Sequence, residues 1–253
     1  MTVRFAARDR VAVLTLDRPD ARNAVDGALA RALDEAVGRL ESSDDLWVGI
    51  LAATGPAFSA GADLKAIAAG RGAELATAHG FGGFVRWPRT KPIIAAVDGP
   101  ALAGGLELVL ACDLVVASER ATFGIPEVKR SLVAAAGGLF RLPAALPRNV
   151  ALELGVTGEP MSAARAAELG LVNRLVPPGQ ALDAALELAG RIVVNAPVAV
   201  RETRRVMLAA KHVDETEAWR LSEEALRRAR DSNDGAEGPR AFIEKRAPVW
   251  TGR

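Results

Sequence analysis

Apolar positions in the first part of the chain follow two spacings, one typical of strands and one typical of helices. Short runs rich in β-branched and apolar residues predict two strands within Val3–Asp17, then buried strands at Trp47–Ala53 and Pro92–Val97. Between the first two of these regions, apolar residues recur at helical spacing from an N-cap at Asp26 to about Leu40. This alternation of strand and helix predicts an α/β core with parallel strands and crossover helices.

The remaining pattern predicts more helices and one more strand. Residues 66–89 have a weak, mostly helical pattern with several glycines, which is typical of a mobile wall over a site. Further helices are predicted at about Pro147–Leu154, Ser162–Leu169 and Gly179–Val194, with a strand at Leu171–Val176.

Beyond Ala196 the composition shifts to helices of mixed charge, which usually form a solvated or subunit-packing face. We therefore predict a catalytic core over residues 1–196 and a C-terminal helical oligomerisation region over residues 197–253.

Two stretches of very small residues each follow a predicted core strand. They are Ala60–Ala62 and Ala103–Gly105, where small side chains leave backbone N–H groups uncovered. The N–H groups of Ala60 and Gly104 could therefore point at one carbonyl oxygen, and Gly104 would also open a helix whose positive end adds to the field. Such an arrangement stabilises an oxyanion, for which a thioester enolate is one candidate.

Two glutamates near these stretches are candidates for acid–base chemistry. Glu107 interrupts the apolar run Leu106–Ala111, in which no residue three or four positions away can pair with a charge. It either reaches solvent on an exposed strip of helix or faces a cavity with a raised pKa. Glu127 follows Pro126 at a helix start, where an acid can simply complement the helix dipole. Together the two carboxylates could act as general acid and base.

The composition argues against several other classes of function. The 253 residues include 32 Lys and Arg against 31 Asp and Glu, few aromatics and no Tyr, which does not favour a nucleic-acid or membrane-surface partner. One cysteine excludes an intramolecular disulfide, and two distant histidines supply neither a metal site nor a Ser–His–Asp triad. With no secretory signal pattern and no apolar stretch long enough for a membrane span, we expect a cytoplasmic protein.

Three motifs in this order resemble the crotonase (enoyl-CoA hydratase/isomerase) superfamily. They are Phe58–Leu64, Ala101–Leu108 and Phe123–Glu127, with supporting likeness at Arg18–Ala24 and Phe242–Arg246. The resemblance implies an α/β fold in which ββα units spiral on themselves, followed by a C-terminal helical region. It also implies that this region packs homotrimers, which pair into hexamers.

The same resemblance implies an acyl-CoA thioester as substrate, with no metal and no cofactor beyond the CoA of the substrate itself. Ala60 and Gly104 match the oxyanion-hole amides. Glu107 matches the group that orients and deprotonates the attacking water, and Glu127 matches the group that exchanges the proton at C2. Positions that match CoA-binding residues are Ala60, Gly61, Ala62, Asp63, Leu64 and Gly104 in the same chain, and Phe242 and Lys245 towards a neighbouring subunit.

Both glutamates together favour a hydratase. Moving a double bond needs one base, whereas adding water across it benefits from two groups. We therefore predict an enoyl-CoA hydratase, a lyase that adds water across the 2,3 double bond. The alternatives are an enoyl-CoA isomerase or another crotonase-type acyl-CoA enzyme, and then a non-catalytic acyl-CoA-binding relative. Where many family hydratases have Gly, Pro and Gly, this chain has Ser131–Gly137, which predicts a differently shaped floor near the acyl group.

Overall fold

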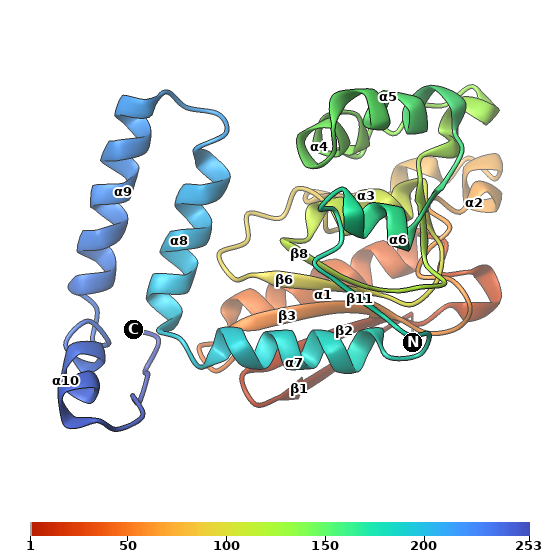
Figure 1. Ribbon diagram of the computed structural model, residues 1–253. Helices are drawn as coiled ribbons and strands as arrows, with labels where there is room; N and C mark the ends of the chain where they lie inside the picture. The colour runs from red at the N-terminus through yellow and green to blue at the C-terminus, as the bar shows by residue number, and fades with distance from the viewer. Residues whose placement is uncertain (1) are drawn as a thin grey trace.

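A six-stranded sheet forms the centre of the computed structural model, which describes residues 2–253. β1 and β2 form an antiparallel hairpin, whereas every other neighbouring pair in this sheet is parallel. The strands that the apolar pattern predicts are therefore present, in the parallel arrangement expected of an α/β core. In order across the sheet (Figure 1) they are β1 (Val3–Arg8), β2 (Val11–Leu16), β3 (Val48–Ala53), β6 (Ile93–Val97), β8 (Leu114–Ser118) and β11 (Arg174–Val176).

The central strands β3, β6 and β8 are buried on both faces of the sheet, which explains why they read as continuous apolar runs. On one face, Leu51 and Ile93 join the larger core with α1 (Gly27–Ser42) and α3 (Gly104–Ala111). On the other face, Ile50 and Ile94, the sequence neighbours of Leu51 and Ile93, pack against small residues of α7 (Ala181–Val193). As predicted, α1 begins after Asp26, whose side chain accepts a hydrogen bond from Leu29 N.

A second, three-stranded sheet brings the two small-residue loops together. It contains β7 (Ala101–Leu102), β9 (Thr122–Gly124) and β10 (Met161–Ser162), in the order β10, β9, β7. Pairs of strands followed by a helix recur along the chain, as β1–β2–α1 and as β6–β7–α3. A bridge between Ser59 and Ala101 attaches the loop after β3 to β7, so this loop lies beside the segment that leads into α3.

The segment from 66 to 89 differs from its prediction, because most of it is not helical. It contains the end of the short helix α2 (Leu64–Ala68), a 3-10 turn at Gly72–Leu75 and a small hairpin of β4 (Ala76–Thr77) and β5 (Gly80–Phe81). Four of its glycines, at 70, 80, 82 and 83, have positive φ angles. A helix cannot accommodate that conformation, so these glycines end it and produce turns instead.

Helices α5 (Arg148–Thr157) and α6 (Ala163–Glu168), like α7, lie where the sequence pattern predicts helices. α4 (Gly138–Ala145) has no counterpart among the predicted elements, because it begins at the end of a run of alanines and glycines, 134–138, that has no apolar periodicity. Together α4 and α5 cover the side of the molecule that also carries α2 (Figure 1).

Three helices follow residue 196, namely α8 (Pro197–Ala209), α9 (Glu215–Arg230) and α10 (Glu237–Glu244). α8 and α9 pack against each other as a hairpin that extends away from the sheet (Figure 1). In α9, all of whose residues the structure describes, none is buried. The division into a core and an oligomerisation region stays a prediction. No helix within residues 2–253 is long and apolar enough to cross a membrane.

Asn23 holds together two turns at the edge of the small-residue loop. Its side chain is fully buried and accepts a hydrogen bond from Arg18 N at 2.8 Å. Its Nδ2 donates to Thr54 O at 2.8 Å and to Ala57 O at 2.9 Å. The turn after β2 is thereby fixed to the turn after β3, directly ahead of Ala60.

We expect Asn23→Ala to lower the free energy of unfolding by about 2–4 kcal/mol, because it leaves one buried and two part-buried backbone groups without their partner. Urea denaturation followed by circular dichroism measures the change. Asn195→Ala is the matched control, since this exposed side chain donates to a single carbonyl, Arg191 O. Equal losses in the two variants would contradict the role assigned to Asn23.

Candidate active site

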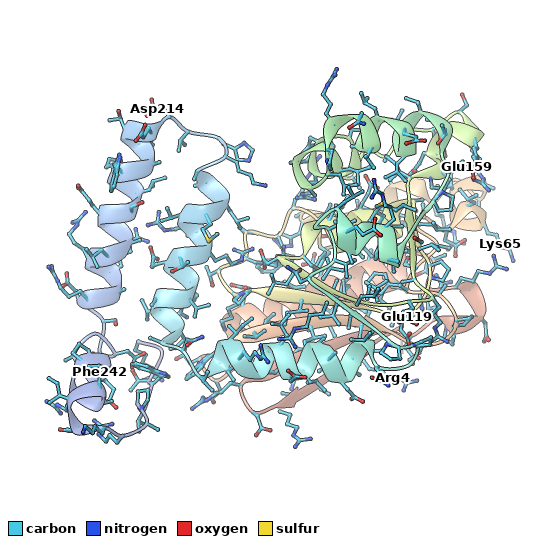
Figure 2. All side chains as sticks on the ribbon, viewed as in Figure 1. Arg4, Lys65, Glu119, Glu159, Asp214 and Phe242 are labelled. Atoms are coloured by element: carbon cyan, nitrogen blue, oxygen red, sulfur yellow. The ribbon has the colours of Figure 1, made fainter. Side chains whose placement is uncertain are left out.

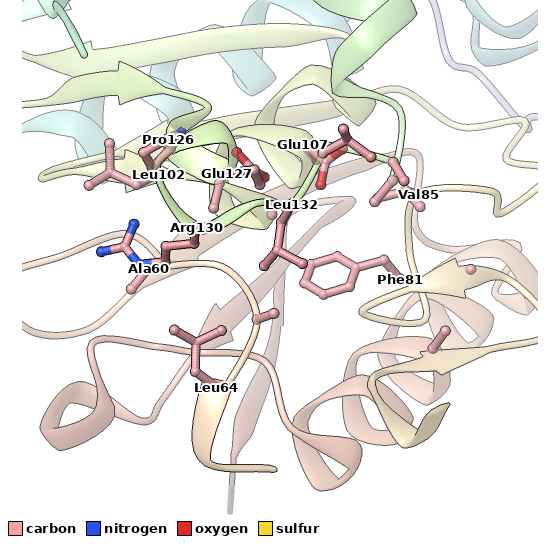
Figure 3. Close-up of a pocket in the computed structure, with 18 of the residues that line it drawn as sticks. Ala60, Leu64, Phe81, Val85, Leu102, Glu107, Pro126, Glu127, Arg130 and Leu132 are labelled. Atoms are coloured by element: carbon pink, nitrogen blue, oxygen red, sulfur yellow. The ribbon is translucent and has the colours of Figure 1, made fainter. Parts of the chain in front are cut away.

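A cavity of about 690 Å³ opens between α3, the loop after β3, the hairpin β4–β5 and the segment 126–136. Figure 3 shows that Glu107 and Glu127 lie close together in its middle, with Phe81 and Val85 on the side of Glu107 and Ala60 and Arg130 on the opposite side. The cavity therefore collects residues from five separate segments of the chain. Its lining includes Arg22, Ala60, Ala62, Leu64, Thr77, Phe81, Val85, Arg86, Leu102, Gly104, Glu107, Glu127, Arg130, Leu132, Val133 and Ala136.

Glu107 is buried in the first turn of α3, as the interruption of the apolar run suggested. Its Oε1 accepts a hydrogen bond from Gly138 N, at the start of α4, at 2.9 Å. Burial raises the pKa of this carboxyl, and the nearby charge of Glu127 raises it further. The sequence left two possibilities for Glu107, an exposed position on the helix or a position facing a cavity. The structure shows the second.

Glu127 lies in the 3-10 turn η3 (Pro126–Arg130), directly after the proline that starts it. Its Oε2 is buried and has no hydrogen-bond partner among the residues that the structure describes. Burial raises its pKa as well. A buried carboxylate oxygen without a partner is costly, which argues for a role beyond complementing the helix dipole.

The backbone amides of Ala62 and Gly104 are two donors in the cavity lining that form no hydrogen bond among the described residues. A parallel bridge to Val25 uses Gly61 O and Asp63 N, so Ala62 N–H faces the other way. Gly104 is the first residue of α3 and its N–H has no partner inside the helix. Within residues 2–253, neither of these two N–H groups forms a hydrogen bond.

Ala60 differs from its sequence-based assignment. Ala60 and Ala62 line the cavity as expected. The N–H of Ala60, however, donates a hydrogen bond to Arg22 O at 2.9 Å. That amide is therefore occupied in holding the loop against the turn after β2. The donor that faces the cavity alongside Gly104 is two residues further on, at Ala62.

Two glycines allow the loop and the helix to approach this closely. A Cβ on Gly61, whose φ is +87°, would lie 2.7 Å from Gly104 N. A Cβ on Gly105 would lie 2.2 Å from Ser59 O. Any side chain at either position would push the loop and the start of α3 apart. Ala103, with φ +53° and ψ −129°, makes the bend into α3, and a non-glycine residue in this region indicates strain held by its surroundings.

The other residues singled out in the sequence divide into two groups. Leu64 lines the cavity, whereas Asp63 lies outside its described lining, caps α2 and pairs with Arg18 at 3.2 Å. Phe242 and Lys245 also lie outside the cavity, on and just after α10. Figure 2 places Phe242 at the opposite end of the molecule from Lys65 of α2. The structure of one chain therefore does not bring these two residues to the site.

Sequence reasoning missed the cationic residues of the lining, Arg22, Arg86 and Arg130. Each sits in a turn rather than on a periodic face, so no spacing pattern marks it. Arg22 does lie inside the Arg18–Ala24 segment, and its positive φ of 52° reflects the tight turn there.

A family model described as enoyl-CoA hydratase/isomerase matches residues 6–253. The chain belongs to this family. It is 40% identical over 247 residues to a carnitinyl-CoA dehydratase of Salmonella typhi, covering 95% of this chain and 94% of that protein.

Solved structures agree in fold over the whole length. A probable enoyl-CoA hydratase/isomerase from Mycobacterium abscessus is 52% identical, with a TM-score of 0.95, and the match covers 100% of this chain and 99% of that one. An enoyl-CoA hydratase from Mycobacterium tuberculosis H37Rv is 46% identical with a TM-score of 0.96 and the same coverage. A carnitinyl-CoA hydratase from Mycobacterium avium is 46% identical with a TM-score of 0.78, again with that coverage.

The crotonase fold and superfamily inferred from the motifs are confirmed. Family membership supports a crotonase-type hydratase or dehydratase activity, a lyase reaction on an acyl-CoA thioester.

The raised pKa of Glu107 leads us to predict how the stability of the fold changes with pH. Because the folded chain holds this proton more tightly than the unfolded chain, stability falls as pH rises from the unfolded pKa through the folded pKa. Glutamine keeps an acceptor for Gly138 N–H and carries no charge. We therefore expect Glu107→Gln to raise the melting temperature at about pH 8 and to lose most of that advantage near pH 4.

Differential scanning fluorimetry at the two pH values measures this difference. The exposed Glu119, outside the cavity lining, supplies the control variant Glu119→Gln, which should show no pH-dependent gain. A gain for Glu107→Gln that is the same at both pH values would show that its charge is not what destabilises the fold.

Proposed function

We propose that this chain is an enoyl-CoA hydratase that adds water across the 2,3 double bond of an enoyl-CoA thioester. The observation that carries the proposal is the meeting of a buried carboxyl group, a half-buried one and two unbonded backbone amides at one cavity. A thioester carbonyl at the amides would place its C2 and C3 beside the carboxyl groups. The family of the chain supports the same reaction class.

In this proposal Ala62 N–H and Gly104 N–H donate to the thioester oxygen. The amino-terminal end of α3 adds a positive potential at the same point. Negative charge develops on that oxygen when the double bond is attacked, so fixed donors there stabilise the transition state more than the ground state. The small residues of the two loops serve this purpose by leaving the amides open.

Glu107 and Glu127 then handle the protons. The water oxygen forms a bond to C3 while its proton passes to Glu107, and the electrons of the double bond move towards the thioester oxygen. A proton from Glu127 adds at C2 as those electrons return. The resting pair must therefore share one proton, which two like charges in one cavity favour, and its two apparent pKa values belong to the pair.

The CoA portion would enter from the side of the cavity that carries Ala60, Leu64 and Arg130 (Figure 3). Arg22, whose carbonyl accepts from Ala60 N–H, lies on the same side. Both arginines are exposed and suit the negative phosphates of CoA. We propose no cofactor other than this CoA, because the reaction moves only water and protons.

We also propose that the chain works as a homo-oligomer assembled through residues 197–253. Large apolar side chains are exposed there, including Met207, Trp219 and Leu226. The side chain of Phe242 is 85% exposed and is not part of the described lining of the cavity in its own chain. The sequence resemblance assigns it, with Lys245, to the CoA of a neighbouring subunit.

We expect Glu107→Gln and Glu127→Gln each to lower kcat by about 100- to 10,000-fold, because each removes one proton-transfer group. Crotonyl-CoA is the substrate, and loss of the conjugated-thioester absorbance together with a mass gain of one water measures hydration. Affinity for a saturated acyl-CoA should change little in either variant.

Glu119→Gln is the control and should keep its full rate, because this exposed carboxylate lies outside the cavity lining. A variant at Glu107 or Glu127 with full activity would remove that residue from the mechanism. Movement of the double bond without a gain of water would indicate an isomerase instead.

The oxyanion donors can be tested by replacing single amides with esters. Incorporation of lactic acid at position 62 keeps the methyl group and removes the N–H, and we expect kcat to fall by about 100- to 1,000-fold. The same replacement at position 60 removes the hydrogen bond to Arg22 O and should act mainly on the melting temperature. A larger loss of kcat at position 60 than at 62 would return the assignment to Ala60.

A further inference from the structure

The far end of the cavity, beyond Glu107, lies next to an excess of positively charged side chains. Val85 and Arg86 line the active-site cavity and also line a second cavity of about 770 Å³ behind it. The second cavity is surrounded by basic side chains, namely Arg86, Arg89, Arg141, Arg204, Lys211 and His212, against the single acid Asp113 among its described lining residues.

Arg141 lies directly behind the catalytic end of the cavity. It is on α4, three residues after Gly138, whose N–H binds Glu107. Its Nη2 donates to Val85 O at 2.6 Å, while its buried Nη1 has no partner in the part of the chain that is described. The guanidinium thus supports the wall of the acyl pocket and carries a charge that Glu107 only partly balances.

Arg89 adds a second buried cation next to Arg141. Its guanidinium lies over the ring of Phe84 and donates to Ala111 O at the end of α3. Its Nε and Nη1 are buried and, across residues 2–253, form no hydrogen bond. Burial lowers the pKa of both arginines, yet a guanidinium stays charged in proteins.

The acids nearby do not cancel these charges. Asp113 is already paired with Arg204 at 2.9 Å. In the described lining of the two cavities, three carboxyl groups, at 107, 113 and 127, stand against seven arginine and lysine side chains. A positive potential therefore reaches the acyl pocket through the wall formed by Val85 and Arg86.

We propose that this end of the acyl pocket selects enoyl chains that carry a carboxylate at their far end and rejects chains that carry a quaternary ammonium group. The inference rests on the proposed acyl-CoA function of the site. A carboxylate is attracted by Arg86, which lines the pocket, and by the guanidinium of Arg141 behind Val85, whose Nη1 has no partner among the described residues. A quaternary ammonium would need aromatic faces, and of the described residues lining the cavity only Phe81 is aromatic.

The experiment compares three but-2-enoyl thioesters of CoA that carry a carboxylate, a trimethylammonium or a neutral tert-butyl group at C4. The last two have nearly the same shape, so their difference reports charge alone. We expect kcat/KM to fall in the order carboxylate, tert-butyl, trimethylammonium, with about a tenfold step for each unit of charge. Turnover of the trimethylammonium substrate at least as fast as the tert-butyl one would overturn the proposal.

Variants locate the effect on the basic wall. Arg86→Glu alters an exposed side chain and should reduce the preference for the carboxylate by about tenfold or more, with Arg86→Gln in between. Arg227→Gln is the matched control, because this exposed arginine of α9 lines neither cavity. A preference that stays the same in Arg86→Glu would also count against the proposal.

Binding of the saturated forms of the three thioesters, measured by isothermal titration calorimetry, separates this inference from the proposed reaction. If no substrate gains water but the saturated carboxylate binds most tightly, the hydratase proposal fails and the charge selectivity stands. If crotonyl-CoA is hydrated and the three saturated ligands bind equally, the hydratase proposal stands and the selectivity fails.

Discussion

The close contact between the loop after β3 and the start of α3 is the constraint on which the site depends. The Gly61 backbone lies against Gly104 N, and Gly105 lies against Ser59 O, with no room for a Cβ in either place. The bridge from Ser59 to Ala101 and the buried side chain of Asn23 hold the loop in this position. Since β3 and β6 are parallel neighbours, both loops leave the same edge of the sheet. The two free amides result from that arrangement of the backbone.

The same cavity concentrates charge that the fold must tolerate. Two carboxyl groups with raised pKa values face it, and one of their oxygens has no described partner. Behind them lie guanidinium groups that are also incompletely bonded. Buried polar groups of this kind reduce stability in most settings, and their concentration at one place is what a reactive site requires.

The strands, the first helix and the cavity-facing position of Glu107 could be predicted, because each depends on a pattern of apolar and polar residues that are close in sequence. Asp26 as a cap and the apolar run around Glu107 are visible within a few residues. The choice between Ala60 and Ala62 is different, since it depends on which amides pair with Arg22 and Val25, nearly forty residues earlier. The turns at Gly80 and Gly82, and the helix that positions Arg141, were likewise hidden, because glycine-rich segments carry little periodicity.

The hairpin of α8 and α9 has a consequence for the thermodynamic cooperativity of the chain. α9 buries none of its residues, and its main described contacts are with α8, including surface ion pairs such as Arg228 with Glu202. Such pairs contribute little and weaken in salt, and a sixteen-residue helix is marginal in water by itself. In a single chain the hairpin therefore opens at a lower free energy than the sheet. Melting of the protomer is then a sequence of events rather than one transition, and its apparent midpoint depends on protein concentration whenever association covers the hairpin.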